Sequence, residues 1–323
     1  MKFSSNAAAA LSALTCSGAN ACEDCTNNST DPIGLVPAPW TLHGQVYVIP
    51  LLDLGLTGPL PTKAYSPLER SSAEFTDAGE FIAGLGNIQI IRYADSPVGP
   101  YDELLLVPGF WRYEDAEGQQ QEDVRVSRIY VSQKYTCNNG RLNWNIPKHL
   151  ARFDWTENED GSTTVKVFPY DTEGDAAESK PAAQPWFQTT FSPKLGQTDP
   201  AAKPGFQTTL EKNDPLSTLL DGKVDVSFNL VQPPIPAGPG NGSYGELPGT
   251  DHWAKIVPGE SADNSVSGLF DMDQGDGDVA ANGTNAVGDE YYPNFWPNLP
   301  RMSPGLRMDN ATITFGEATY WKA

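Results

Sequence analysis

The chain has little of what marks nucleic-acid-binding and membrane proteins. Its 323 residues include only 21 lysines and arginines against 41 aspartates and glutamates, a formal net charge of −20. A surface with this excess of negative charge repels nucleic acid and anionic lipid. No apolar run approaches the roughly 18 residues that a membrane-spanning helix needs. We therefore expect neither a nucleic-acid partner nor a membrane partner.

Cysteine and histidine are too scarce, and too poorly spaced, for a familiar metal site. The pair Cys22-x-x-Cys25 has the spacing of redox and zinc motifs, but no second pair or histidine follows nearby. The acidic run Asp271–Asp278 lacks the phased ligands and the terminal glutamate of an EF-hand loop. The sequence predicts no metal and no cofactor. The four cysteines are Cys16, Cys22, Cys25 and Cys137.

Residues 1–36 are predicted to lie outside the folded domain, as a leader followed by a linker. Lys2, the weakly apolar Ala7–Leu14 and the small-residue pattern Ala19-Asn20-Ala21 are typical of a signal peptide over residues 1–21. A disordered N-terminal tail is the alternative. Removal of this leader would leave three cysteines, enough for one disulfide and one odd thiol. The sequence leans towards a secreted protein, with a cytoplasmic one as the alternative.

Glycine and proline are abundant, with 30 and 28 residues, which favours a loop-rich β protein over a helical bundle. Residues 53–79 look like an excursion, Asn138-Asn139-Gly140 predicts a turn, and no long amphipathic helix is expected. We predict a mainly β (β-rich α+β) fold in one domain, residues 37–323. Alternating or continuous apolar segments predict strands over 41–52, 80–93, 104–111, 124–135, 151–155, 163–169, 224–231 and 311–320.

The segment 140–151 carries a lysine in a setting that suits covalent chemistry. Lys148 follows Pro147, where the chain must turn. Desolvation disfavours an ammonium, so a buried lysine here would present a free amine that attacks carbonyls to give an imine. The alternative is a solvated, unreactive lysine. The apolar residues that would wall it are Trp144, Ile146 and Leu150.

Gly140-Arg141 and Pro147-Lys148-x-Leu150, at this spacing, resemble the signature of the acetoacetate decarboxylase superfamily. In that family the lysine after the proline is the imine-forming nucleophile. Gly99-Pro100-Tyr101-Asp102-Glu103-Leu104 resembles the family's loop with an active-site glutamate, and Glu103 is the matching position. The resemblance implies an antiparallel, cone-shaped β-barrel with long loops and a small-molecule carbonyl substrate.

The resemblance makes Lys148 the amine and Glu103 the group that orients substrate or moves protons. Arg141 could pair with Glu103, hold a substrate anion or fix a strand end. His149 is either a proton donor or a residue that satisfies local hydrogen bonds, and when protonated it would favour the neutral amine of its neighbour. Further candidates for substrate binding are Tyr101, Arg92 and Trp144.

Two departures from the family's pattern bear on the reaction. The decarboxylase has a second lysine where His149 stands, and the first-strand arginine that faces the substrate carboxylate has no counterpart in Leu42-His43-Gly44-Gln45-Val46. We expect a Schiff-base-forming carbon–carbon lyase, decarboxylase-like, acting on a β-keto acid or related carbonyl compound. The alternatives are an aldolase, dehydratase or cyclase for a larger, secondary-metabolite-like substrate, and a non-enzymatic small-molecule binding protein. A homo-oligomer is compatible with each.

Overall fold

The computed structural model describes residues 32–53, 58–170, 180–183, 185–193, 224–238, 247–272 and 303–322. The predicted leader and three of the cysteines lie outside this range. The fourth, Cys137, is buried, and its Sγ donates to the carbonyl oxygen of Lys148 at 3.1 Å. In the described part of the chain, no helix is long and apolar enough to cross a membrane.

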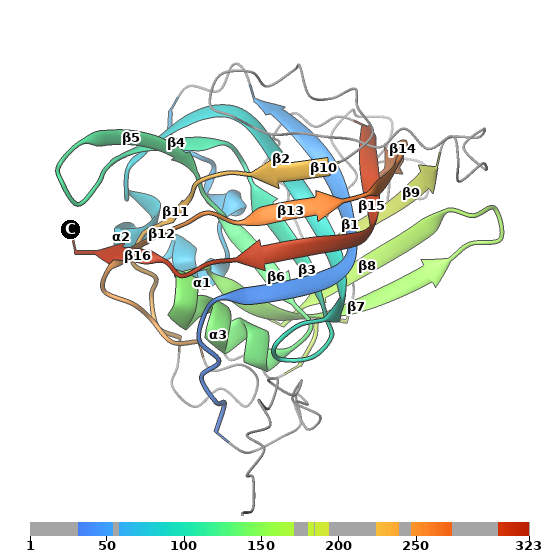
Figure 1. The fold of residues 1–323 in the computed structure, drawn as a ribbon, viewed down its shortest axis with the longest axis horizontal. Coiled ribbons are helices and arrows are strands. Elements are labelled where there is room, and N and C mark those ends of the chain that lie inside the picture. Colours follow the sequence, from blue (N-terminus) through green and yellow to red (C-terminus); the bar gives the residue numbers. More distant parts are fainter. Residues whose placement is uncertain are drawn as a thin grey trace, which may run out of the picture.

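Nine strands close into a barrel (Figure 1). It closes because β1 (Trp40–Asp53) pairs with β2 (Glu80–Asp95) along one edge and β15 (Pro304–Phe315) along the other. The fold class is confirmed as mainly β, with one correction: β6 and β7 run parallel, so the barrel is mixed rather than purely antiparallel. The other members are β3 (Tyr101–Val107), β6 (Arg128–Val131), β7 (Lys148–Glu157), β8 (Thr163–Pro169), β9 (Phe187–Pro193) and β14 (Asn264–Asp271).

Shorter strands extend the sheet beyond this barrel. One row continues from the start of β2 through β4 (Phe110–Glu114), β5 (Gln120–Val124), β11 (Leu230–Gln232), β12 (Trp253–Ile256) and β16 (Thr319–Trp321). A second row adds β13 (Gly259–Ala262) and β10 (Val224–Ser227) to the edge of β15. The added strands from the last third of the chain thus lie beside β5 in the first row and beside β15 in the second.

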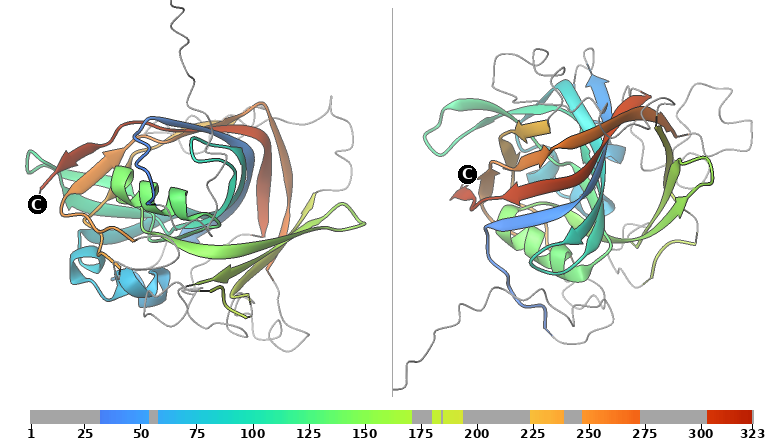
Figure 2. Two further views of the ribbon diagram at one scale, coloured as in Figure 1. Left: turned by 90° about the horizontal axis from the view of Figure 1, so that it is seen from below. Right: turned by 45° about the vertical axis from the view of Figure 1, so that its right-hand side comes forward.

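The parallel pair requires a crossover, and α3 (Lys134–Trp144) supplies it. The helix begins at Gln133, whose side chain accepts from the Thr136 N–H, and ends at Asn145 in the left-handed conformation (φ 54°). Figure 2 shows α3 running across the end of the barrel that is seen from below. The predicted turn at 138–140 is therefore wrong. Every residue of α3 except Leu142 is buried, and its polar residues lie all round the helix. The sequence therefore lacks the separate polar and apolar faces that identify an amphipathic helix.

The other strand predictions hold with shifted ends. The hairpin of β7 and β8 is confirmed, whereas 104–111 is divided between β3 and β4 at Gly109, which has a φ of 151°. The strand predicted over 124–135 divides between β5 and β6, and the segments 224–231 and 311–320 each divide between two strands. The excursion at 53–79 contains three short helices: η1 (Thr62–Ala64), α1 (Pro67–Arg70) and α2 (Ala73–Thr76).

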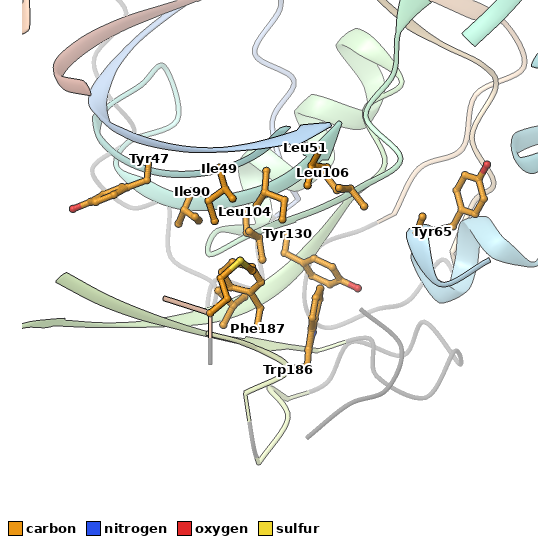
Figure 3. Packing of buried hydrophobic residues seen from close by; sticks show 14 of the residues in the cluster. Tyr47, Ile49, Leu51, Tyr65, Ile90, Leu104, Leu106, Tyr130, Trp186 and Phe187 are labelled. Atoms are coloured by element: carbon orange, nitrogen blue, oxygen red, sulfur yellow. The ribbon is translucent and has the colours of Figure 1, made fainter. Parts of the chain in front are cut away.

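The barrel wall is buried on both faces. Figure 3 shows one face, where Ile90 and Leu104 point toward Phe187, and Tyr130 meets Trp186 edge-on with ring centroids 4.9 Å apart. The opposite face packs against α3 and contains a second cluster, with Val46, Ile91, Leu105, Ile129 and Leu150. Successive residues of a strand point to opposite sides, so strands buried on both faces have almost continuous apolar sequences. The face toward α3 is the one that carries the candidate site.

Candidate active site

Lys148 is the first residue of β7, directly after a tight turn in which its N–H donates to the Ile146 carbonyl at 2.7 Å. The sequence placed it within the turn, and the structure places it at the start of the strand. Its side chain is 4% exposed. The stem crosses α3 at Gly140, where an added Cβ would lie 2.6 Å from Lys148 Cδ and 2.8 Å from Cε. Glycine at 140 thus leaves room for the lysine stem and does not form a turn.

The amine of Lys148 meets Glu103 on the face of the sheet toward α3. Nζ donates to Glu103 Oε2 at 2.8 Å and to Thr136 Oγ1 at 3.0 Å. Glu103 pairs with Val131 of β6, and Lys148 pairs with Ile129 of the same strand, so the two side chains reach across β6 toward each other. Glu103 is 2% exposed. The structure thus brings together the two residues that the resemblance singled out.

Two tyrosines separate this ion pair from a cleft. Tyr93 donates to Glu103 Oε1 at 3.2 Å, and the Tyr101 ring centroid lies 5.2 Å from Lys148 Nζ. The two rings contact each other with centroids 4.5 Å apart. Burial, and then the charge of Glu103, raise the pKa of both tyrosines well above the ordinary value, so both remain neutral hydroxyls. Both line a cleft of about 830 Å³, which therefore ends one side chain away from the amine.

Arg92 lines the same cleft but lies away from Lys148. It is exposed, and its guanidinium is 3.9 Å from Asp102, 3.6 Å from Glu157 and 4.6 Å from the centre of the Trp155 ring. Burial raises the pKa of Asp102 to about 6, against the opposing effect of Arg92. Arg92 thus lines the cleft, and its contact with a substrate stays a prediction.

Arg141 and His149 belong to a different buried site, built around Glu69 of α1. Arg141 Nη1 donates to Glu69 Oε1 at 2.9 Å, and His149 Nε2 lies 2.7 Å from Oε2. Burial acts to raise the pKa of Glu69, but the charges and hydrogen bonds of His149 and Arg141 outweigh it and hold the pKa below its ordinary value. The expected pairing of Arg141 with Glu103 is wrong.

Arg141 fixes the start of β7, the third of the roles expected for it. It also donates to the carbonyl oxygens of Lys148 at 3.2 Å, Pro236 at 2.6 Å and Pro248 at 3.0 Å. His149 pairs with Tyr130 in the β6–β7 register and points to the opposite face from Lys148. The structure therefore separates His149 from the amine that the sequence expected it to assist.

Trp144 packs in the core and is not among the residues that line the cleft. Its indole N–H donates to the Gly316 carbonyl at 2.9 Å, and its ring meets Trp40 edge-on with centroids 5.1 Å apart. It stabilises the end of α3. The structure shows a packing role for Trp144, and its expected contact with substrate stays a prediction.

Sequence reasoning missed several buried polar residues: Tyr93 and Thr136, which contact Glu103 and Lys148, Glu69 of the separate Arg141–His149 site, and Gln89 and Glu260, which hydrogen-bond to each other at 3.4 Å. Ser66-Pro67 ahead of Glu69 has the N-cap and N1 chemistry of a helix start, which could have indicated α1. Thr136 could not be placed near Lys148 because the sequence did not predict α3, the helix that carries it. Nothing in the local sequence marks Glu260, because its position in the site depends on a pairing between distant strands.

No family model matches the chain. Two curated plant proteins, both named Protein NEOXANTHIN-DEFICIENT 1, match a part of it. The one from Oryza sativa subsp. japonica is 29% identical over 120 residues, 37% of this chain and 35% of that protein. The one from Arabidopsis thaliana is 26% identical over 121 residues, 37% of this chain and 38% of that protein. The chain thus matches little more than a third of the length of these relatives.

Solved structures of similar shape include acetoacetate decarboxylase from Legionella pneumophila, with 12% identity and a TM-score of 0.46 over 91% of this chain and 92% of that chain. An acetoacetate decarboxylase-like enzyme from Sphingomonas wittichii RW1 has 9% identity and a TM-score of 0.45 over 89% and 94% of the two chains.

Proposed function

We propose that the protein is an enzyme that forms a Schiff base between Lys148 and a carbonyl substrate and then makes or breaks a bond next to the imine carbon. The observation that carries this proposal is the buried amine of Lys148, 2.8 Å from Glu103 and one tyrosine away from a cleft. A buried lysine beside a proton acceptor and an accessible cavity has what nucleophilic catalysis needs.

The first step requires a neutral amine. A proton on Nζ can pass to Glu103 Oε2, and the hydroxyl of Thr136 keeps Nζ in place. Nζ then attacks the carbonyl carbon, Glu103 returns its proton to the carbonyl oxygen, which leaves as water, and a cationic imine remains beside an ionised Glu103. This cation withdraws electrons from bonds at the neighbouring carbon, which is the electron sink that carbon–carbon chemistry requires.

The step after the imine depends on the substrate. A β-keto acid would lose carbon dioxide, and the resulting enamine would take a proton at carbon. A ketone with an adjacent C–H would instead give that proton to Glu103, and its enamine would add to a second carbonyl group. The cleft of about 830 Å³ favours the second possibility, an aldolase, dehydratase or cyclase, because it has room for more than a four-carbon acid.

Borohydride trapping tests the proposal. The protein is incubated with acetoacetate and with a panel of aldehydes and methyl ketones; hydride then reduces any C=N bond to a stable secondary amine. We expect mass spectrometry to map the adduct to Lys148. The Lys148→Met variant should give no adduct at this position, and Lys166→Met, which removes an exposed lysine of β8, should leave it unchanged.

Absence of an adduct on Lys148 with every carbonyl, in protein shown to be folded, would contradict the enzyme proposal. Tight binding of a ligand that survives Lys148→Ala would favour a binding protein on the same scaffold.

A further inference from the structure

A second buried carboxyl group, that of Glu260, lies near enough to Glu103 for the charge of Glu103 to raise its pKa. Glu260 belongs to β13, is 8% exposed, and accepts a hydrogen bond from Gln89 Nε2 at 3.4 Å. Gln89 is in the same row of the sheet as Ile129 and Lys148, since it pairs with Leu105 of β3, which pairs with Ile129 of β6. Glu260 therefore faces the site from β13, a strand far from β2, β3 and β7 in the sequence.

The charges that act on Glu260 are negative. Burial raises its pKa to about 7; the charge of Glu103 adds to this effect and the hydrogen bond from Gln89 opposes it. Glu260 and Glu103 also both act on Tyr93, which lies against Glu103. Among the described residues no cation contributes to the shift of Glu260, so this carboxyl is not held as one half of an ion pair.

The cations Arg141, Arg92 and Lys148 each have a carboxylate partner other than Glu260. Arg141 is bound to Glu69, and Arg92 lies at the cleft near Asp102 and Glu157. The positive charge of Lys148 is matched by Glu103 at 2.8 Å. A carboxylate next to the reacting carbonyl would therefore meet two glutamates and no guanidinium in the described part of the chain.

We propose that Glu260 determines the substrate class of this site: the enzyme takes a carbonyl compound that has no negative charge next to its reacting carbonyl, an aldehyde or a neutral ketone, in preference to a β-keto acid. The inference rests on the proposed Schiff-base function and narrows it. When protonated, Glu260 donates a hydrogen bond to a substrate oxygen; when ionised, it repels a substrate carboxylate. A neutral ketone has no carboxylate to lose, so the bond that breaks next to its imine is C–H, with the proton passing to Glu103.

Acetoacetate and its methyl ester form a matched pair for the test, because they differ in the charge next to the ketone. Each is trapped with borohydride, and the total adduct on Lys148 is counted, with and without loss of carbon dioxide, which mass distinguishes. We expect the wild-type protein to prefer the ester, and the preference to grow between about pH 6 and about pH 8 as Glu260 ionises.

Two variants isolate Glu260 from Glu103 and Tyr93, the other titratable groups that face it. Glu260→Gln should lower the ester-to-acid ratio about tenfold at the upper pH and remove most of its pH dependence. Gln89→Met should shift the pH dependence upward, because the lost hydrogen bond had opposed the rise in the pKa of Glu260. Glu114→Gln, at an exposed position of β4, should change neither.

Unfolding curves establish that each variant is folded. Equal trapping of ester and acid by the wild-type protein, or an unchanged ratio in folded Glu260→Gln, would overturn the role of Glu260 and leave the Schiff base intact. Absence of any adduct on Lys148 would instead contradict the proposed function itself.

Discussion

Lys148 and His149 are consecutive residues that enter two different buried carboxylate sites. The amine of Lys148 meets Glu103 on the face toward α3, and the imidazole of His149 meets Glu69 on the opposite face. Both carboxylates are almost fully buried, and both have a cationic partner within 3 Å. The two sites differ in what else surrounds them.

The Glu69 site is tied to the backbone. Its arginine also donates to three carbonyl oxygens, so this ion pair joins α1, α3 and the start of β7. The amine of Lys148 donates to the side chains of Glu103 and Thr136 and lies against a tyrosine that lines the cleft. Buried charge therefore does not by itself identify a reactive group. What distinguishes Lys148 is that its amine lies against Tyr101, a residue that lines the cleft.

The largest effect on stability is expected at the Glu69 site. Glu69→Gln leaves the guanidinium of Arg141 buried without its carboxylate, and should lower the free energy of unfolding by about 3–5 kcal/mol. Denaturant titration measures it, with Glu74→Gln, an exposed position of α2, as the control expected within about 0.5 kcal/mol of wild type. The folded fraction should still form the carbonyl adduct on Lys148. Loss of the adduct in folded protein would show that Glu69 takes part in the reaction, and would contradict the distinction between the two sites.

The next largest effect is a loss of turnover, and we expect it for substitution of Glu103 and not of Glu69. Glu103→Gln should slow turnover about 100-fold or more, because general acid–base catalysis is lost, while the adduct on Lys148 remains detectable. The substrate for this assay is the carbonyl compound that labels Lys148 most strongly. Glu157→Gln, at the exposed end of β7, should keep the wild-type rate. An unchanged rate in Glu103→Gln would remove this residue from the mechanism.

The smallest effect is the change in stability on substitution of Gly140, and its sign decides between two explanations. By helix propensity, Gly140→Ala within α3 should stabilise the protein by about 1 kcal/mol. The contact with the Lys148 stem predicts the opposite, a loss of about 1–3 kcal/mol with weaker trapping, because the added methyl group displaces the lysine. Gly316→Ala, where the methyl group enters open space, is the control for both measurements. A gain in stability with full trapping would show that the lysine stem moves freely.

The strand-rich class and the β7–β8 hairpin could be predicted from local patterns, and Lys148 and Glu103 could be selected as site residues from one resemblance, although their ion pair was not predicted. It did not allow α3 to be predicted. Asn138, Asn139 and Gly140 are turn-forming residues in isolation, and tertiary burial on all sides of the helix overrides that preference.

The partners of the site residues were also beyond the sequence. Glu69 is separated from Arg141 by 72 positions, and Gln89 from Glu260 by 171. No local pattern encodes such pairings, which arise when the strand register and the helix positions are fixed. The roles expected for His149 and Arg141 failed for a simple reason: alternation along β7 sends His149 to the face opposite Lys148, and Arg141 meets its carboxylate from α1.

The closing pair of the barrel has a consequence for how the protein is made. Trp40 at the start of β1 pairs with Phe315 at the end of β15, and β15 in turn carries β13 with Glu260. During synthesis β1 and β2 emerge long before residue 315. Neither the barrel nor the wall with Glu260 can form until β15 has been made. Pairings of such long sequence separation are slow, and strands that wait expose unpaired edges. Full assembly of the Lys148 site is thus a late event in folding, and its rate should depend on how well β1 and β2 are protected until β15 arrives.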